Sequence, residues 1–192
     1  MAKVHPNISD QLATWISRQP MYFLASAPLQ ANGHINLSPR GLDSLRVLDA
    51  QHVLMLDYVG SGNETAAHLL QNGRLTVMFC AFEGDPQILR LYGKGTVIRP
   101  EDTHWSELRA HFADMLSGVR QLFLLEVTRV QTSCGFGVPL MNLQGQRELL
   151  PQWAQKRGDD ALKTYQLEKN SRSIDGLPAP GLAEKETDMF SG

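Results

Sequence analysis

Hydrophobic residues along the chain form short runs separated by turn residues, a pattern that predicts strands. Large apolar and β-branched side chains dominate six runs, and glycine, proline or asparagine borders most of them. The runs cover residues 21–27, 34–38, 52–57, 74–82, 86–98 and 122–130. Because most connections have hairpin length, we expect a mostly β, α+β fold, a six-stranded barrel with peripheral helices.

Five further segments have helical periodicity, at residues 9–19, 64–71, 100–115, 148–155 and 160–168. Ser9 and Asn63 occupy the cap positions of the first two, which Pro20 and Gly73 end. The third places three apolar residues on one face: Trp105, Leu108 and Phe112. Residues 45–49 fit either a short helix or a strand.

The second run follows a predicted hairpin turn at residues 31–33 and alternates apolar with polar side chains. Its apolar residues, Ile35 and Leu37, therefore share one face of the strand, and the intervening polar pair, Asn36 and Ser38, shares the other. Two polar groups thus project together.

Arg40 follows in a predicted turn, residues 38–41, that ends this strand. An arginine at a strand end can be an ordinary solvated surface charge. Its guanidinium also suits a phosphate if the helix after Asn63 lies nearby.

The sequence Gly60-Ser61-Gly62 joins the strand at 52–57 to the helix at 64–71. A helix that begins at a glycine turn presents unpaired N–H groups and the positive end of its dipole, which together favour an anion. The same residues would also serve a purely structural purpose, turning the chain and capping the helix.

Known nucleotide loops differ from this turn. No Gly-Lys-Ser or Gly-Lys-Thr closes it, Glu64 would repel a polyphosphate, and the three-glycine spacing of dinucleotide sites is absent. A single phosphate held mainly by backbone groups fits better.

Two glycines, Gly93 and Gly95, interrupt the long run at 86–98, as at a bulge or barrel corner. Cys80 lies in an apolar run and is predicted to be an inert core residue. Cys134 lies in a glycine-rich turn predicted at residues 132–139, where it could serve packing or react as a thiol.

Composition excludes several classes of partner. The 192 residues include 18 basic and 20 acidic side chains, a net charge of -2, so no field of one sign favours nucleic acid or membrane lipid. The cysteine spacing fits no zinc pattern, the start of the chain has no apolar signal core, and no run could cross a bilayer. We expect a cytoplasmic protein without a metal site.

The residues resemble the pyridoxamine 5'-phosphate oxidase-like family with the FMN-binding split-barrel fold, in an uncharacterised branch. The resemblance covers about residues 11–131. It is carried, in order, by residues 34–41, 60–65, 72–74, 78–82 and 90–95, with later segments 133–139 and 173–178 matching that branch.

The resemblance implies a homodimer with FMN in a cleft between two barrels. It assigns the ring to Asn36, Leu37 and Ser38, and the phosphate to Arg40, Asn63 and Thr65. The remaining contacts implied are Tyr58, Val59 and Glu64.

The chain departs from the true oxidases at several positions. They carry an Arg-Lys pair where this chain has Glu64-Thr65, and an arginine where it has Asn36, which leaves Arg40 as the best cation for a flavin phosphate. Arg172 is a lone counterpart of their arginine-rich C-terminal segment. We therefore expect a flavin-dependent oxidoreductase with a substrate other than pyridoxamine phosphate.

Three parts are expected: a split-barrel domain at 1–131, an extension at 132–178 whose short helices pack on the barrel or on the dimer partner, and a disordered tail at 179–192. Residues 170–178 fit a coil.

Two alternatives stay open. The barrel could bind haem with His34, His68 or another histidine as axial ligand, or it could be a scaffold dimer without a cofactor. Cys134 could reach the flavin of a dimer neighbour. No residue is identified as a catalytic acid or base.

Overall fold

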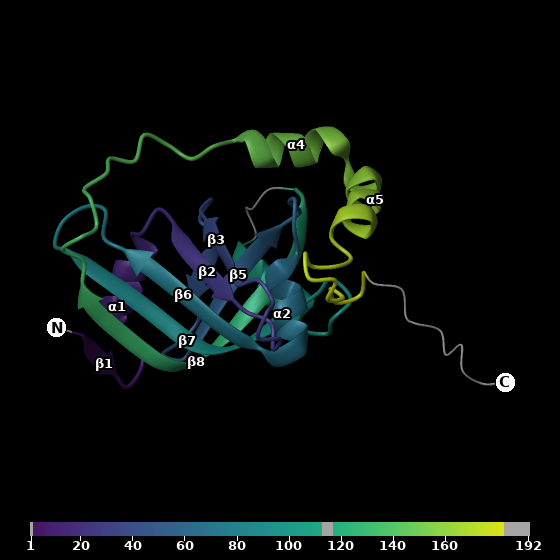
Figure 1. The fold of residues 1–192 in the computed structure, drawn as a ribbon. Helices are drawn as coiled ribbons and strands as arrows, with labels where there is room; N and C mark the ends of the chain where they lie inside the picture. Colours follow the sequence, from purple (N-terminus) through teal and green to yellow (C-terminus); the bar gives the residue numbers. More distant parts are fainter. Residues whose placement is uncertain (1, 113–116, 183–192) are drawn as a thin grey trace.

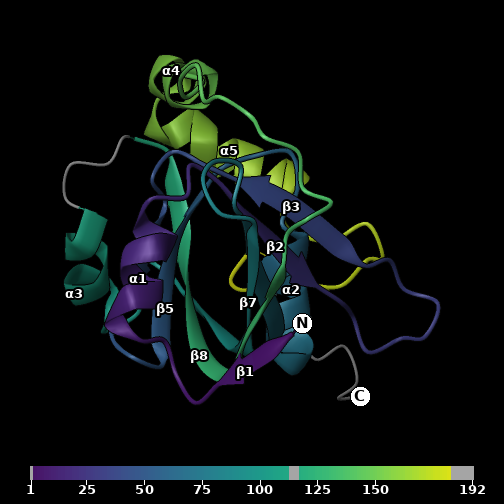
Figure 2. The same ribbon diagram turned by 90° about the vertical axis from the view of Figure 1, so that its left-hand side faces the viewer.

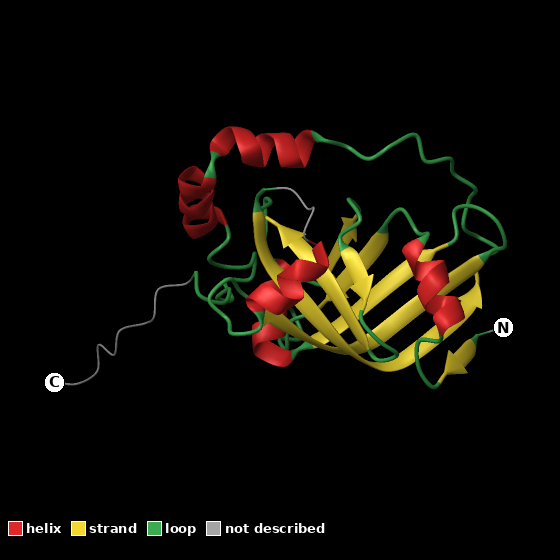
Figure 3. Cartoon of the chain, turned by 180° about the vertical axis from the view of Figure 1, so that it is seen from behind, coloured by secondary structure: helices red, strands yellow, loops and turns green. Residues whose placement is uncertain are grey.

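A single curved antiparallel sheet forms the centre of the structure, a computed structural model that describes residues 2–112 and 117–182. Its strands are β1 (Lys3–His5), β2 (Tyr22–Ser26), β3 (Asn36–Arg40), β4 (Leu45–Val47), β5 (His52–Tyr58), β6 (Arg74–Cys80), β7 (Gln87–Ile98) and β8 (Val119–Cys134). They are ordered β3-β2-β6-β7-β8-β5-β4, and β1 pairs with β8. Figure 3 shows the strands curled into one layer with the helices at its margins.

The helices are α1 (Asp10–Ser17), α2 (Glu64–Asn72), α3 (Trp105–Arg109), α4 (Leu149–Arg157) and α5 (Asp159–Lys169), with a 3₁₀ turn at Ala110–Phe112. Residues 139–148 form an extended connection before α4 (Figure 1). Figure 2 shows α4 and α5 together beyond the strand ends, away from β1. Within the described ranges, no helix is long and apolar enough to cross a membrane.

All six predicted strands are present, which confirms the α+β fold class. The ambiguous segment at 45–49 contains strand β4, and β1 was not predicted. Strand β8 is long enough to pair with β7 on one edge and with both β5 and β1 on the other. This one strand therefore organises the sheet.

The boundaries of β3 correct two predictions. The strand begins at Asn36, so the loop after β2 covers residues 27–35 and is longer than a hairpin turn at 31–33. It continues through Arg40, with Pro39 paired to Phe23, so residues 38–41 are not a turn. Proline is tolerated here because β3 is an edge strand, the position to which proline is largely confined within sheets.

The helix predicted at 100–115 is too long. Helix α3 begins at Trp105, after turns in which the Asp102 carboxylate accepts a hydrogen bond from the Arg99 N–H at 2.6 Å. Aspartate favours such local bonds over a helix interior. Residues 113–115 lie outside the described residues, but the predicted apolar face is confirmed because its members join one buried cluster: Trp105, Leu108 and Phe112.

Two other predictions concern glycine. The ladder between β7 and β8 shifts register between Tyr92 and Gly93, which confirms the bulge, and a Cβ at Gly93 would collide with the Glu126 carbonyl oxygen. The glycine-rich turn after β8 is shorter than predicted, because β8 continues to Cys134 and the turn begins at Gly135.

The C-terminal part packs back onto the barrel. Ala154 of α4 and Leu162 of α5 bury Val59, which follows β5. Ala179 is also buried and donates its N–H to the Ser171 carbonyl at 2.9 Å. Of the tail predicted to be disordered, residues 183–192 lie outside the described residues.

Candidate functional site

A cavity of about 420 Å³ lies between β3, the end of β5 and the start of α2. Most of the predicted cofactor residues line it: Asn36, Ser38, Arg40, Tyr58, Asn63, Glu64 and Thr65. Residues 60–62 form one wall, and Leu150 of α4 closes part of another. The sheet curls enough to bring its edge strand β3 beside β5, so segments distant in sequence meet here.

Two predicted residues do not line this cavity. Leu37 is 63% exposed on the outer face of β3. Val59 is buried against Ala154 and Leu162 in the cluster under α4 and α5. Neither side chain is in position to contact a ligand inside the cavity.

Strand β3 turns its polar face toward the cavity. Ser38 Oγ donates a hydrogen bond to Asn36 Oδ1 at 3.0 Å, and Asn36 Nδ2 donates one to Thr65 Oγ1 at 3.0 Å. The apolar residues of the strand face outward, and Ile35 beside it is 76% exposed. The predicted alternation is therefore present, with the polar side inward.

Asn63 stands at the N-cap of α2, but its side chain makes no capping hydrogen bond, so that part of the prediction was wrong. Instead Asn63 Nδ2 donates to the Asn170 carbonyl at 3.2 Å, and Asn63 Oδ1 accepts from Gln121 Nε2 at 2.8 Å. Burial at the junction with β8 redirects the amide. The N–H groups of the first helical turn are left uncapped by this side chain.

Glu64 is also directed away from the cavity centre. Its two carboxylate oxygens accept hydrogen bonds from the Ile174 N–H at 3.1 and 3.2 Å. Glu64 therefore secures the C-terminal segment.

A buried charged network lies beside the cavity, and its two arginines, Arg40 and Arg120, line the cavity wall. Asp57 is wholly buried, with its Oδ1 2.6 Å from Arg40 Nη1 and its Oδ2 2.7 Å from Arg120 Nη2. Gln121 Nε2 donates to Asp57 Oδ2 at 2.8 Å. Arg120 Nη1 also donates to the Gly62 carbonyl at 3.0 Å, so the network supports the glycine turn.

Arg40 is therefore not an ordinary solvated surface charge, because its guanidinium pairs with the buried Asp57 carboxylate. The prediction that Arg40 contacts a phosphate stays a prediction. Burial alone would raise the pKa of Asp57, but the charges of Arg120 and Arg40 and the hydrogen bonds from Arg120 and Gln121 hold it below its ordinary value. Asp57 is an anion, and it neutralises part of the charge of both arginines.

Asp57, Arg120, Gln121 and Asn170 were missed by sequence reasoning. A carboxylate at the end of a bulky, β-prone run was a usable sign that Asp57 has a buried partner. Asn170, whose Nδ2 donates to the Gly60 carbonyl at 3.0 Å, had no such sign.

Tyr58 lines the cavity with its ring packed in the cluster that contains Ile98 and Phe112. Burial raises the pKa of the Tyr58 phenol, so it stays protonated at neutral pH.

The histidines and cysteines singled out in the sequence lie outside the cavity lining. His34 Nδ1 pairs with Asp175 Oδ1 at 2.6 Å, and His68 is fully buried. Cys80 is buried, as predicted, and Cys134 is exposed. In the part of the chain that the structure describes, no three or more His, Cys, Asp and Glu residues are grouped to hold a metal ion.

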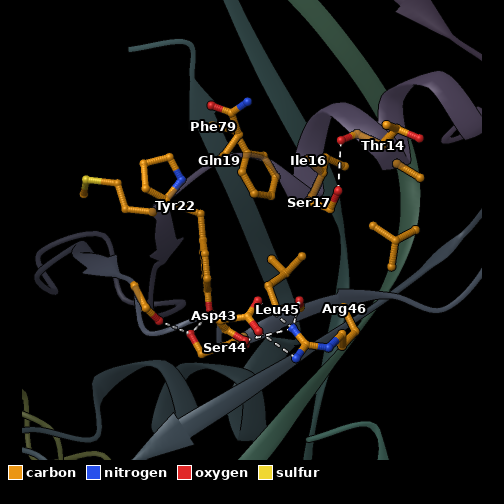
Figure 4. A pocket seen from close by; sticks show the side chains of 15 residues that line it. Thr14, Ile16, Ser17, Gln19, Tyr22, Asp43, Ser44, Leu45, Arg46 and Phe79 are labelled. Atoms are coloured by element: carbon orange, nitrogen blue, oxygen red, sulfur yellow. Dashed lines mark hydrogen bonds and ion pairs between the residues drawn. The ribbon is translucent and has the colours of Figure 1, made fainter. Parts of the chain in front are cut away.

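A second cavity, of about 510 Å³, lies between α1 and the segment around β4 (Figure 4). Its walls include Tyr22 and Phe79, and Asp43 and Arg46 face each other at one edge, with Arg46 Nη1 2.8 Å from Asp43 Oδ1. Although larger, it contains none of the nine predicted cofactor residues and no helix N-terminus, so we assign the candidate site to the smaller cavity.

Comparison with known proteins identifies the family. The family model for pyridoxamine 5'-phosphate oxidase matches residues 8–134. The pyridoxamine 5'-phosphate oxidase family protein ustO of Aspergillus flavus is 39% identical over 204 residues, covering 97% of this chain and 81% of that protein.

Two solved structures share the fold. HupZ of Group A Streptococcus superposes with a TM-score of 0.55 at 17% identity, covering 66% of this chain and 99% of HupZ. A Lactobacillus delbrueckii protein described as a candidate pyridoxamine 5'-phosphate oxidase gives 0.50 at 14% identity, covering 66% of this chain and 94% of that one. The chain belongs to the pyridoxamine 5'-phosphate oxidase family and has the split-barrel type of α+β fold.

Proposed function

We propose that the protein binds FMN in the cavity between β3, β5 and α2 and uses it for a redox reaction on a small organic substrate. The observation that carries this proposal is the meeting of two features in one cavity of about 420 Å³. One is the inward polar face of β3, and the other is the start of α2, which its N-cap side chain leaves uncapped.

The residues present fit a single phosphate. Uncapped N–H groups and the helix dipole favour an anion at the start of α2, and the Thr65 hydroxyl lies in the same turn. The Arg40 side chain is 24% exposed at the wall. Because Asp57 already neutralises part of the charge of Arg40 and Arg120, the site suits one phosphate better than a polyphosphate.

Bound flavin would supply hydride or electron transfer, and the chain would position it and exclude water. We propose that Asn36 and Ser38, which line the cavity, hydrogen-bond a polar edge of the ring. The neutral Tyr58 phenol forms part of the wall, and Leu150 covers the cavity with an apolar side chain.

The substrate we propose carries no phosphate of its own. The Arg172 guanidinium donates to the Gly176 carbonyl at 3.0 Å and does not line the cavity. The arginine-rich pocket for a vitamin phosphate thus has no counterpart in the described residues near the site.

We also propose a homodimer that uses the outer face of β3. Ile35 and Leu37 expose most of their apolar surface there, next to the cavity wall. Exposed apolar groups gathered on one sheet face favour association, so a second copy would both cover them and enclose the site.

Haem is less well supported. His68 has no exposed surface, and neither it nor His34 lines the cavity.

Titration with FMN tests the proposal. Binding should quench the fluorescence of FMN and raise the melting temperature of the protein. At an FMN concentration 100 times the dissociation constant, mass action should raise the free energy of unfolding by about 2.7 kcal/mol. Unchanged melting and fluorescence would contradict flavin binding. A Soret band in the purified protein would favour haem instead.

A further inference from the structure

A line of hydrogen-bonded side chains connects the protein interior to the cavity wall. His68 on α2 is fully buried, and its Nδ1 lies 2.9 Å from Ser26 Oγ at the end of β2. Ser26 is the cross-strand partner of Asn36, whose Nδ2 lies 3.5 Å from Ser26 Oγ. His68 does not line the cavity, yet it is linked to a residue that does.

The other ring nitrogen of His68 makes the arrangement unusual. Nε2 is buried and has no hydrogen-bond partner among residues 2–112 and 117–182. Burial lowers the pKa of His68, so the ring is neutral, with one N–H donor and one acceptor nitrogen. A buried polar atom without a partner costs stability, and such an atom calls for an explanation.

The direction of the bond to Ser26 decides how Asn36 is oriented. If Nδ1 is the acceptor, the Ser26 hydroxyl proton is committed to His68, and Ser26 Oγ can only accept from Asn36. The Asn36 amino group must then face Ser26, because the amide oxygen would meet a second acceptor.

That orientation fixes the polarity of the wall. The Asn36 amide oxygen accepts the Ser38 hydroxyl proton, so Ser38 is left with lone pairs to offer a ligand. Thr65 Oγ1 accepts from the Asn36 amino group and keeps its own proton to donate. Toward a ligand, the Ser38 hydroxyl is therefore an acceptor and the Thr65 hydroxyl is a donor.

We propose that His68 is a positioning residue, which orients Asn36 by accepting a hydrogen bond from the Ser26 hydroxyl. With Asn36 in this orientation, the cavity selects a ligand that offers an N–H group to Ser38 and an acceptor oxygen to Thr65. Flavin has both, in its ring and its phosphate tail, so the inference rests on the proposed function. The unpaired Nε2–H is the cost of making Nδ1 an acceptor.

The first test uses the full chain without ligand. Nitrogen-15 NMR of the imidazole should find the His68 proton on Nε2. A proton on Nδ1 would overturn the proposal whether or not FMN binds, because Ser26 could then donate to the amide oxygen of Asn36.

The second test measures FMN dissociation constants. Ser26→Ala and His68→Phe should each weaken binding about tenfold, the size of one lost hydrogen bond, and the double variant should lose no more, because both remove one linkage. His68→Gln keeps an acceptor and should stay within about threefold of the wild type. His52→Phe, at the far end of β5, is the matched control and should not change binding.

Wild-type affinity for FMN in Ser26→Ala would overturn the proposal. Because Ser26→Ala removes only one oxygen atom, it keeps the test valid even if His68→Phe fails to fold. If the wild type binds no FMN, the proposed function fails on its own. The positioning role is then judged in the free protein by the Asn36 side-chain amide signals, which must shift in Ser26→Ala but not in His52→Phe.

Discussion

The charged and the neutral polar side chains around the candidate cavity differ in how far they are paired within the protein. Among the charged side chains, Asp57 pairs with Arg40 and Arg120 inside the protein, and the network connects β3, β5 and β8. Among the neutral side chains, Ser38 and Thr65 keep hydrogen-bonding capacity that faces the cavity. The charged groups here pair with one another across the barrel strands, and we propose that the neutral groups recognise the ligand.

The largest expected effect comes from removing the charge at the centre of the network. Asp57→Ala leaves two arginines without their buried counter-ion and should lower the free energy of unfolding by about 3–5 kcal/mol, measured by urea denaturation. Glu83→Ala removes an exposed carboxylate between β6 and β7 and should change stability little. A loss below about 1 kcal/mol in Asp57→Ala would show that the network does not hold the fold.

Acid should weaken the charged network around Asp57. The pKa of Asp57 is lower in the folded state than the unfolded value of about 4, so the folded state binds fewer protons. This contribution to stability is present above that pH and is lost as pH falls toward the folded pKa. The free energy of unfolding should therefore fall more steeply between pH 7 and pH 3 for the wild type than for Asp57→Asn. Parallel plots of this free energy against pH would contradict the lowered pKa of Asp57.

Changes to the neutral side chains should affect binding rather than stability. Thr65→Val removes the hydroxyl proposed to donate to the flavin phosphate and should weaken FMN binding by about 1.5–3 kcal/mol, measured by fluorescence titration. Thr164→Val, on an exposed position of α5, is a matched helical control. Equal affinities in both variants would exclude Thr65 from the phosphate site.

The smallest effect concerns the C-terminal segment beside the site. The hydrogen bond and charge of Asp175 raise the pKa of His34, so the charged contact is fully formed below the ordinary histidine pKa of about 6.5 and weakens as pH rises through the raised pKa. Asp175→Asn should speed amide exchange at residues 172–178 without shifting the midpoint of global unfolding. Unchanged exchange would mean that this contact does not order the segment.

Local pattern predicted the sheet well because strand and helix periodicities depend on neighbours in sequence. It failed where distant residues decide. Asn63 has the right position for a cap, but its side-chain oxygen accepts a hydrogen bond from Gln121, fifty-eight positions away in the sequence. Arg40 looked like a surface charge because its partner Asp57 lies on another strand. The site is assembled by the curl of the sheet, which no single segment encodes.

The central claim is that FMN binds between β3 and the start of α2, and amide NMR during an FMN titration tests it most directly. The account predicts shifts at Gly62, Asn63, Glu64 and Thr65, with residues 13–17 beside the second cavity unchanged. Shifts confined to residues 13–17 and 43–47, or none anywhere at saturating FMN, would contradict it.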